Sequence, residues 1–268
     1  VLFIAIVAVF LRFGTGLPSP AELERIRFSQ ESIVYDRTGR EMARFSLGER
    51  RETAAYEELP PILIDATTAV EDKTFWTNSG FDPLGFASAA FDTITGGQRG
   101  GSTITQQLVR NTLLEAADFE GSVYARKVKE MIQAIRVTKT FPGDAGKETI
   151  MRAYLNTNYY GARAYGILAA SQEYFGISDL SQLTLGQAAL LAGIPQSPST
   201  FDLRASATTD ATGLITVALD SPVAQRRLDV LATMKNARNA GLLRDNTIND
   251  EALAAAAVEP IQIGRAHV

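Results

Sequence analysis

Cysteine is absent from this chain of 268 residues, and its only histidine is His267. Without cysteine the chain can form no disulfide framework, no thiolate metal site and no thiol nucleophile. We do not expect a histidine at position 267 to belong to a packed site, so histidine acid–base chemistry and histidine-rich metal sites are also excluded. Any chemistry must then use carboxylates, lysine, arginine, hydroxyls or amides.

A strong positive charge is also lacking, because the formal net charge is −4 at pH 7. A general nucleic-acid-binding domain is usually basic, so this class of protein is disfavoured. Between Arg99 and Arg152, however, nine lysines and arginines stand against six acidic residues. A solvated helical face is the ordinary explanation of such a local excess, and attraction of an anionic ligand is the alternative.

A long hydrophobic run is lacking as well. The apolar stretch "VLFIAIVAVFL" covers residues 1–11. As a helix it would be about 16 Å long, roughly half of the hydrocarbon core of a bilayer. We interpret residues 1–14 as a truncated transmembrane anchor. The apolar region of a signal peptide is the alternative, although no small-x-small cleavage site precedes the polar segment "GTGLPSP".

The rest of the chain divides into three parts. Residues 15–57 are predicted to form a linker and a short β-hairpin, with two strands around the turn in "SIVYDRTGREMARF". Helical periodicity predominates in residues 58–235, so we predict a mainly α domain there. Within it, residues 204–223 are expected to form a polar insertion with one strand. The alanine-rich residues 236–268 are interpreted as a linker towards a missing C-terminal region.

The stretch "GGSTITQQLVRN" combines two glycines, hydroxyls and amides with a single cation. Thr103 and Gln106 satisfy the T-x-x-Q capping box, so a helix is predicted to begin after Thr103. The unpaired N–H groups and positive dipole of a helix start suit a phosphate or pyrophosphate. Thr103, Gln107 and Arg110 follow one another at i, i+4 and i+7, which makes one polar stripe. A well-capped surface helix is the alternative.

A second motif, "VEDKTFWTNSGFDP", places Glu71 and Asp72 at the end of an apolar helix, close to Phe75 and Trp76. A carboxylate beside aromatic surface is partly desolvated, which raises its pKa and suits it to act as a general base or acid. Acidic helix surface next to core aromatics is the alternative.

A third motif, "RKVKE", places Arg126 and Glu130 on one helix face, with Lys127 one turn before Glu130. A solvated ion-pair face is the usual explanation. Two glutamates on different helices near cations are also what a glycosyl transfer needs. One carboxylate can accept a proton from an attacking hydroxyl, while cations neutralise a phosphate leaving group.

Together these motifs resemble those of the peptidoglycan glycosyltransferase family, the transglycosylase domain of class A penicillin-binding proteins and of monofunctional transglycosylases. The likeness runs from about Leu59 to Met234 and includes "YLNTNYYGARAYGILAASQEYFG" and "LTLGQAALLAGIPQSPSTFD". It implies a mainly α, lysozyme-like fold with a small membrane-facing lobe. The implied reaction polymerises lipid II into β-1,4-linked glycan strands, with inversion and release of undecaprenyl pyrophosphate.

The resemblance also implies roles for individual residues. Glu71 matches the base that deprotonates the 4-hydroxyl of the acceptor. Glu130 matches the second glutamate, which supports the pyrophosphate or a divalent cation, so Mg²⁺ or Mn²⁺ at Glu130 is implied and an organic cofactor is not. The other motif positions are implied to bind substrate: Asp72, Phe75, Asn78, Ser102, Thr103, Gln106, Gln107, Arg110, Asn111, Arg126 and Lys127.

The same resemblance implies the partners and the location. The substrates would be lipid II and the growing glycan strand. The domain would lie on the extracytoplasmic side of the bacterial cytoplasmic membrane, held by a single-pass anchor, with other cell-wall synthesis proteins as partners and no nucleic acid.

Two residues and one connecting segment depart from the family pattern. Asn78 stands where histidine is usual, so a protonated role is lost there. Arg110 replaces a usual lysine, which keeps the charge but presents a planar fork. The connection "TKTFPGDAGKETI" is longer than usual.

The sequence disfavours some other functions and leaves two alternatives open. No D-x-D occurs, which disfavours a nucleotide-sugar transferase, and no Ser-x-x-Lys occurs, which excludes a penicillin-binding transpeptidase within these residues. The remaining alternatives are a lysozyme-like glycan hydrolase and an inactive membrane-anchored scaffold of the wall-synthesis machinery.

Overall fold

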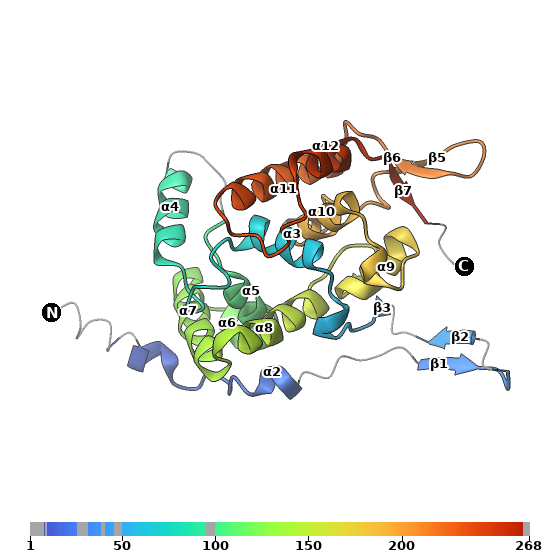
Figure 1. Ribbon diagram of the computed structural model, residues 1–268. Helices are drawn as coiled ribbons and strands as arrows, with labels where there is room; N and C mark the ends of the chain where they lie inside the picture. Colours follow the sequence, from blue (N-terminus) through green and yellow to red (C-terminus); the bar gives the residue numbers. More distant parts are fainter. Residues whose placement is uncertain are drawn as a thin grey trace. The chain divides into compact units, whose positions relative to one another are not determined.

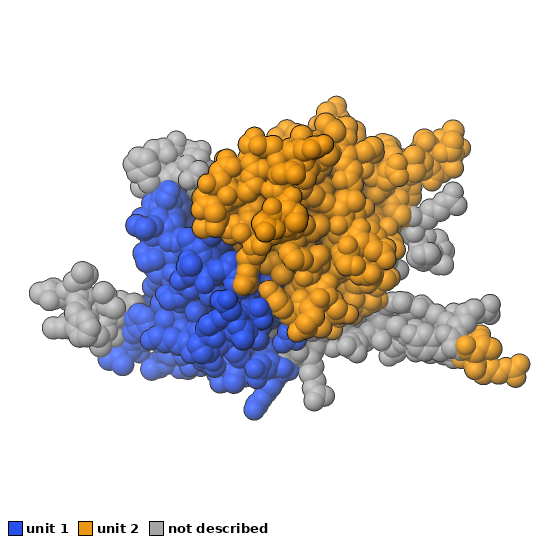
Figure 2. All heavy atoms as spheres, viewed as in Figure 1, with its two compact units in different colours: residues 1–26, 71–154 blue, residues 27–70, 155–268 orange. Residues whose placement is uncertain are grey.

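The computed structural model divides into two compact units, which Figure 2 shows in different colours. Unit 1 comprises residues 1–26 and 71–154, and unit 2 comprises residues 27–70 and 155–268. The structure describes residues 8, 10–25, 32–38, 41–45, 50–94 and 100–264. Helices predominate in this described part, which confirms the predicted mainly α class.

Unit 2 is built around a cluster of small and aliphatic side chains from four helices. α10 packs against both α11 and α12. The capping box predicted for α10 is confirmed, because the Thr184 hydroxyl accepts the Gln187 N–H at 3.1 Å and the Gln187 side chain accepts the Thr184 N–H at 3.0 Å. The helices of this unit are η1 (Tyr56–Glu58), α3 (Pro61–Glu71), α9 (Ile167–Phe175), η2 (Leu180–Gln182), α10 (Leu185–Gly193), η3 (Ile194–Gln196), α11 (Pro222–Asn239) and α12 (Asp250–Val258). The last residue of α3, Glu71, belongs to unit 1.

The strands of unit 2 confirm one prediction and correct another. β1 (Ser32–Tyr35) pairs antiparallel with β2 (Glu41–Phe45), as predicted for the hairpin. β3 (Arg50–Arg51) and β4 (Ala164–Tyr165) form a short parallel pair. β5 (Ala207–Thr209), β6 (Ile215–Val217) and β7 (Ile261–Ile263) lie side by side in an antiparallel sheet (Figure 1). The insertion at residues 204–223 therefore contains two strands, not one.

The described chain after residue 236 is folded, so the prediction of a linker there is wrong as far as residue 264. α11 continues to Asn239, and α12 places Leu253 and Ala256 in the hydrophobic cluster. β7 then pairs with β6. An alanine-rich sequence is a good helix former, and here it is stabilised by packing against α10 and α11.

Buried charged side chains attach this last region to the rest of unit 2. Asp65 of α3 accepts the backbone N–H groups of Arg244 and Asp245 at 2.7–3.0 Å. Burial raises the pKa of Asp65, and these N–H donors act in the opposite direction. Arg227 of α11 donates to the carbonyl groups of Ala257 and Glu259 at 2.9 and 2.7 Å.

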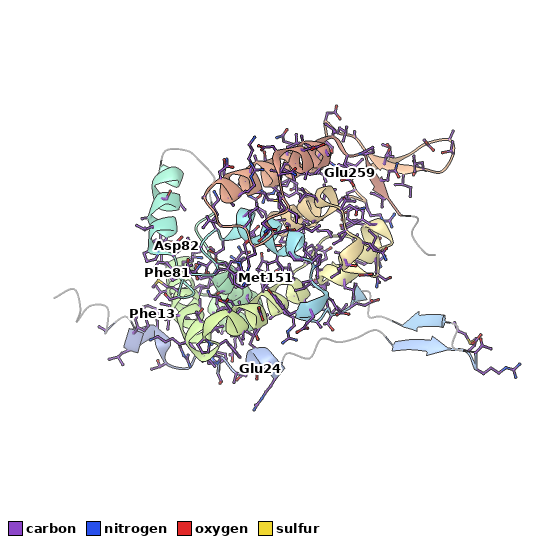
Figure 3. The ribbon with its side chains drawn as sticks, viewed as in Figure 1. Phe13, Glu24, Phe81, Asp82, Met151 and Glu259 are labelled. Atoms are coloured by element: carbon purple, nitrogen blue, oxygen red, sulfur yellow. The ribbon has the colours of Figure 1, made fainter. Side chains whose placement is uncertain are left out.

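The side chain of Glu259, labelled in Figure 3, makes a further link to the start of α10. Its carboxylate accepts the Thr184 hydroxyl at 2.7 Å. Asp65 and Arg227 are buried and would be costly without partners, so their hydrogen bonds fix the path of the chain after α11, and the exposed Glu259–Thr184 bond adds to them.

Unit 1 contains the motifs on which the functional prediction depends. α5 packs against α7, and both helices bury aliphatic side chains. Asp82, labelled in Figure 3, caps α4 by accepting the N–H groups of Leu84 and Gly85 at 3.1 and 3.0 Å. The helices of this unit whose bounds the structure gives are α2 (Glu22–Arg25), α4 (Pro83–Ile94), α5 (Ile104–Thr112), α6 (Ala116–Phe119), α7 (Val123–Thr140) and α8 (Gly143–Thr157), of which residues 143–154 belong to unit 1.

The predicted membrane anchor falls partly outside the described residues, which omit residues 1–7 and 9. Within the part of the chain that is described, no helix has both the length and the apolar character needed to span a bilayer.

Candidate active site

Two adjacent carboxylates stand at the end of α3, and their environments differ. Glu71 is the last residue of the helix and is half-buried, whereas Asp72 is only 7% exposed. The Asp72 carboxylate accepts the Ile104 N–H at 3.1 Å and the Asn78 side-chain amide at 3.0 Å to each oxygen. Burial raises the pKa of Asp72, and these hydrogen bonds act in the opposite direction. Asp72 is thus the desolvated carboxylate that the second motif predicted.

The start of α5 confirms the predicted capping box. The Thr103 hydroxyl accepts the Gln106 N–H at 3.1 Å, and the Gln106 side chain accepts the Thr103 N–H at 2.9 Å. The same hydroxyl donates to the Gly80 carbonyl at 2.7 Å. Thr103 and Gln106 are both buried. Of the predicted polar stripe, Thr103 therefore lies inside unit 1, and Gln107 and Arg110 are partly exposed.

The two glycines before α5 have different environments. A Cβ on Gly101 would lie 2.7 Å from the Ala89 Cβ of α4, so the close approach of α4 requires glycine there. A Cβ on Gly100 would meet no described atom within 4 Å. Packing against α4 thus requires glycine at position 101, whereas a side chain would fit at position 100.

Gln107 connects α5 to Glu71. Its side-chain amide donates to Glu71 Oε2 at 2.7 Å, and its side-chain carbonyl accepts the Tyr154 hydroxyl at 3.2 Å. Because Tyr154 is fully buried in α8, the orientation of the Gln107 amide is fixed from both ends. A charge-assisted hydrogen bond of this kind holds one oxygen of the Glu71 carboxylate in place.

The second glutamate is buried among cations, not on a solvated ion-pair face. Glu130 of α7 is 1% exposed. Lys127 Nζ lies 2.9 Å from Glu130 Oε2, and Arg126 Nε lies 3.6 Å from Glu130 Oε1. Lys127 Nζ also donates to the Ser102 hydroxyl at 2.6 Å, just before α5 begins. The predicted pairing on one helix face is confirmed, and the two cations compensate the buried carboxylate.

Hydrogen bonds therefore link both glutamates to the start of α5, Glu71 directly and Glu130 through Lys127. Gln107 bonds to Glu71, and Ser102 reaches Glu130 through Lys127. This arrangement combines a half-buried carboxylate, a buried carboxylate and two cations around one capped helix start. It can accept a proton at one point and neutralise an anionic group at another.

The other predicted site residues lie at different depths. Arg110 is partly exposed and Asn111 is exposed in the last turn of α5. Phe75 is fully buried, and its ring meets Trp76 edge-on at 5.0 Å between centroids. Asn78 is partly buried and is bonded to Asp72, not directed to open solvent. Phe75 and Asn78 thus contribute to the site as structural support.

Two residues at the site were not predicted from the sequence. Tyr154 holds Gln107, and Lys147 donates to Asn78. Both lie on α8 at i and i+7 with Ile150 and Met151 between them, and all four side chains are buried. A lysine on an otherwise apolar helical stripe was the signal that could have identified Lys147.

The divalent cation implied at Glu130 does not fit this donor set. Both Glu130 oxygens face Lys127 or Arg126, and no group of three or more acidic or histidine side chains occurs among the described residues that could hold a metal. Divalent cations prefer several oxygen ligands. The described residues around Glu130 therefore do not form a divalent-cation site.

The chain is similar to known proteins over most of its length. Residues 38–235 match the family model described as Transglycosylase. The chain is 39% identical over 190 residues to penicillin-binding protein 1A of Vibrio cholerae, covering 70% of this chain and 22% of that protein. It is 38% identical over 188 residues to penicillin-binding protein 1A of Escherichia coli, covering 69% and 21%. It is 37% identical over 180 residues to penicillin-binding protein 1A/1B of Bacillus subtilis, covering 66% and 19%.

The chain thus spans about a fifth of the length of these relatives. The family model covers most of the chain, including both glutamates and the capped helix between them. The chain belongs to the transglycosylase family, the peptidoglycan glycosyltransferases of cell-wall synthesis.

Proposed function

We propose that this chain polymerises lipid II into β-1,4-linked glycan strands, with inversion at the donor's anomeric carbon and release of undecaprenyl pyrophosphate. The observation that carries the proposal is the attachment of both glutamates to the start of α5 through Gln107 and through Ser102 and Lys127. A transfer from a sugar pyrophosphate needs a base and an anion site close together, and this start of a helix joins the two.

In the proposed reaction, Glu71 accepts the proton of the acceptor's 4-hydroxyl as its oxygen bonds to the donor's anomeric carbon. The bond between that carbon and the pyrophosphate oxygen breaks, and its electron pair leaves with the pyrophosphate. Attack from the opposite face inverts the anomeric centre. The Gln107 amide, which donates to Glu71 Oε2, keeps the carboxylate oriented.

The cations of the site suit the departing pyrophosphate. Lys127 and Arg126 are about three-tenths exposed, so each can meet a ligand while still compensating Glu130. Arg110, in the last turn of α5, adds a third partly exposed cation. A planar guanidinium can bind two phosphate oxygens at once.

The test is to incubate the chain with lipid II in detergent and to separate the products by length. We expect glycan polymer and free undecaprenyl pyrophosphate. Shortening of preformed glycan without polymerisation would indicate a lysozyme-like hydrolase instead. Binding of lipid II without any product would indicate an inactive scaffold.

The lipid part of this substrate places the proposed reaction at a membrane. We propose that the domain works at the outer face of the bacterial cytoplasmic membrane and that the apolar residues 1–11 contribute to its attachment. Co-sedimentation with lipid vesicles should be lost in a chain that begins at Gly14. Binding that is unchanged without residues 1–13 would contradict this role.

A further inference from the structure

Lys147 is a buried charged residue that the proposed reaction does not use. It lies on α8 and is 4% exposed. Its ammonium donates to the Asn78 backbone carbonyl at 2.8 Å and to Asn78 Oδ1 at 3.2 Å, and it lies 4.7 Å from the centroid of the Phe75 ring. A buried ammonium is costly unless other groups compensate its charge.

The compensating charge is Asp72, on the other side of the Asn78 amide. Asn78 Nδ2 donates to both Asp72 oxygens at 3.0 Å, while Asn78 Oδ1 accepts from Lys147. The orientation of the amide follows from the chemistry, because a carboxylate only accepts and an ammonium only donates. Asn78 therefore joins a buried anion to a buried cation.

The same network reaches the start of α5. Asp72 Oδ2 accepts the N–H of Ile104, the first residue of that helix, at 3.1 Å. The Thr74 hydroxyl lies 3.2 Å from Asp72 Oδ1 and 3.1 Å from Asp82 Oδ2, so its single proton is shared between these two acceptors. The Ile104 N–H and the Asn78 amide both donate to the Asp72 carboxylate, which fits its ionised form. Asp72 follows Glu71 directly, so the network fixes α5 next to the proposed base.

We propose that Lys147 is a positioning residue, which acts through Asn78 to keep Asp72 ionised and bonded to Ile104, so that Gln107 meets Glu71. The role in catalysis rests on the proposed function, whereas the network itself does not. Loss of the ammonium would leave Asp72 buried without a compensating charge. Its bond to Ile104 would weaken, and the first turn of α5 would lose its attachment to the end of α3.

Asn78 suits this role without carrying a charge. One end of its amide is a donor and the other an acceptor, as the network requires. The side chain of a doubly protonated histidine at this position would offer no acceptor to Lys147, which would keep only the backbone carbonyl. The departure from histidine at Asn78 is thus compatible with an intact site in which Lys147 supplies the positive charge.

The test compares Lys147→Met, Lys147→Arg and a control, Lys139→Met, which removes an exposed lysine from α7. The first readout is hydrogen exchange and the ¹⁵N–¹H signal of the Ile104 amide, which does not depend on any reaction. In Lys147→Met we expect Ile104 exchange to rise about tenfold or more, as for local opening of a helix end. We expect its polymerisation kcat to fall about 100-fold, as for a misplaced catalytic group. Lys139→Met should change neither value.

The second readout is the dependence on pH. Burial lowers the pKa of Lys147 to about 8, while the negative charge of Asp72 acts in the opposite direction. The ammonium is therefore lost as the pH rises through about 8. The polymerisation rate should fall over that range, and the Ile104 signal should titrate with it. In Lys147→Arg the charge persists, so both changes should disappear.

The outcomes separate the two proposals. If Lys147→Met leaves Ile104 exchange unchanged and Lys147→Arg still loses activity as the pH rises through about 8, the positioning role is wrong. If Lys147→Met does not fold, Lys147→Arg decides alone, because that variant keeps the charge and should no longer lose activity over this pH range. If the unaltered chain makes no polymer, the proposed function fails, and the Ile104 amide still decides whether the network exists.

Discussion

Replacing Glu71 with glutamine is expected to lower kcat/KM for lipid II polymerisation by about 10²- to 10⁴-fold, the usual contribution of general acid–base catalysis. Glutamine has the same shape as glutamate, and its carbonyl oxygen can still accept the Gln107 amide that now donates to Glu71 Oε2. The geometry should survive, while the ability to accept a proton is lost. The variant therefore isolates proton transfer from positioning.

The matched control is Glu120→Gln, which removes an exposed carboxylate from the same unit. Polymerisation rates of the three proteins should be measured at saturating and limiting lipid II, with circular dichroism to confirm folding. We expect Glu120→Gln to behave like the unaltered chain. A Glu71→Gln variant that still polymerises at an unchanged rate would show that another group is the base.

Features that depend on neighbouring residues could be predicted from the sequence. The capping box of α5 needs only Thr103 and Gln106, and the pair on α7 needs only Arg126 and Glu130 at i, i+4. Both are governed by the geometry of a single helix, and both are confirmed. The β-hairpin is confirmed for the same reason, since one short turn joins its strands.

Features that depend on distant residues could not be predicted in this way. Asp72 is 32 residues from Ile104, and Lys147 is 69 residues from Asn78. Periodicity indicates which face of a helix is buried but not which helix covers it. The sequence therefore shows the acidic pair at the end of α3, but not the groups of α5 and α8 that compensate the buried Asp72 carboxylate.

The region after residue 236 illustrates the same limit. Its alanine content is compatible with a linker or a packed helix, and only the hydrophobic cluster of unit 2 decides between them. β7 is a strand because β6, far upstream, offers it a partner. Short strands of this kind carry little sequence signal of their own.

Replacing Gly80 with alanine is expected to destabilise unit 1 through a steric conflict with α7. Gly80 has φ = +91°, which a side chain disfavours, and an added Cβ would lie 2.3 Å from the Ala134 carbonyl oxygen and 2.7 Å from Thr138 Oγ1 of α7. The nearest atom belongs to the backbone, so it cannot move aside by changing a rotamer. Either Gly80 or α7 must shift.

Gly143→Ala is the matched control, because Gly143 also has a positive φ, of +69°, but an added Cβ there would meet nothing within 4 Å. This variant should lose about 1–2 kcal/mol of unfolding free energy from the backbone conformation alone. Gly80→Ala should lose about 1–3 kcal/mol more, the usual cost of overpacking. Urea titrations of both variants measure the difference. Equal losses of unfolding free energy would show that Gly80 and α7 accommodate the methyl group without strain.

Activity should separate the two glycines further. The Gly80 carbonyl accepts the Thr103 hydroxyl at 2.7 Å, so a shift of Gly80 displaces the cap of α5. Gln107 lies one turn beyond that cap and bonds to Glu71. Any Gly80→Ala protein that remains folded should therefore polymerise lipid II more slowly, because its base is no longer held by Gln107. Among the described residues Gly143 makes no hydrogen bond to α5, and its alanine variant should keep the rate of the unaltered chain.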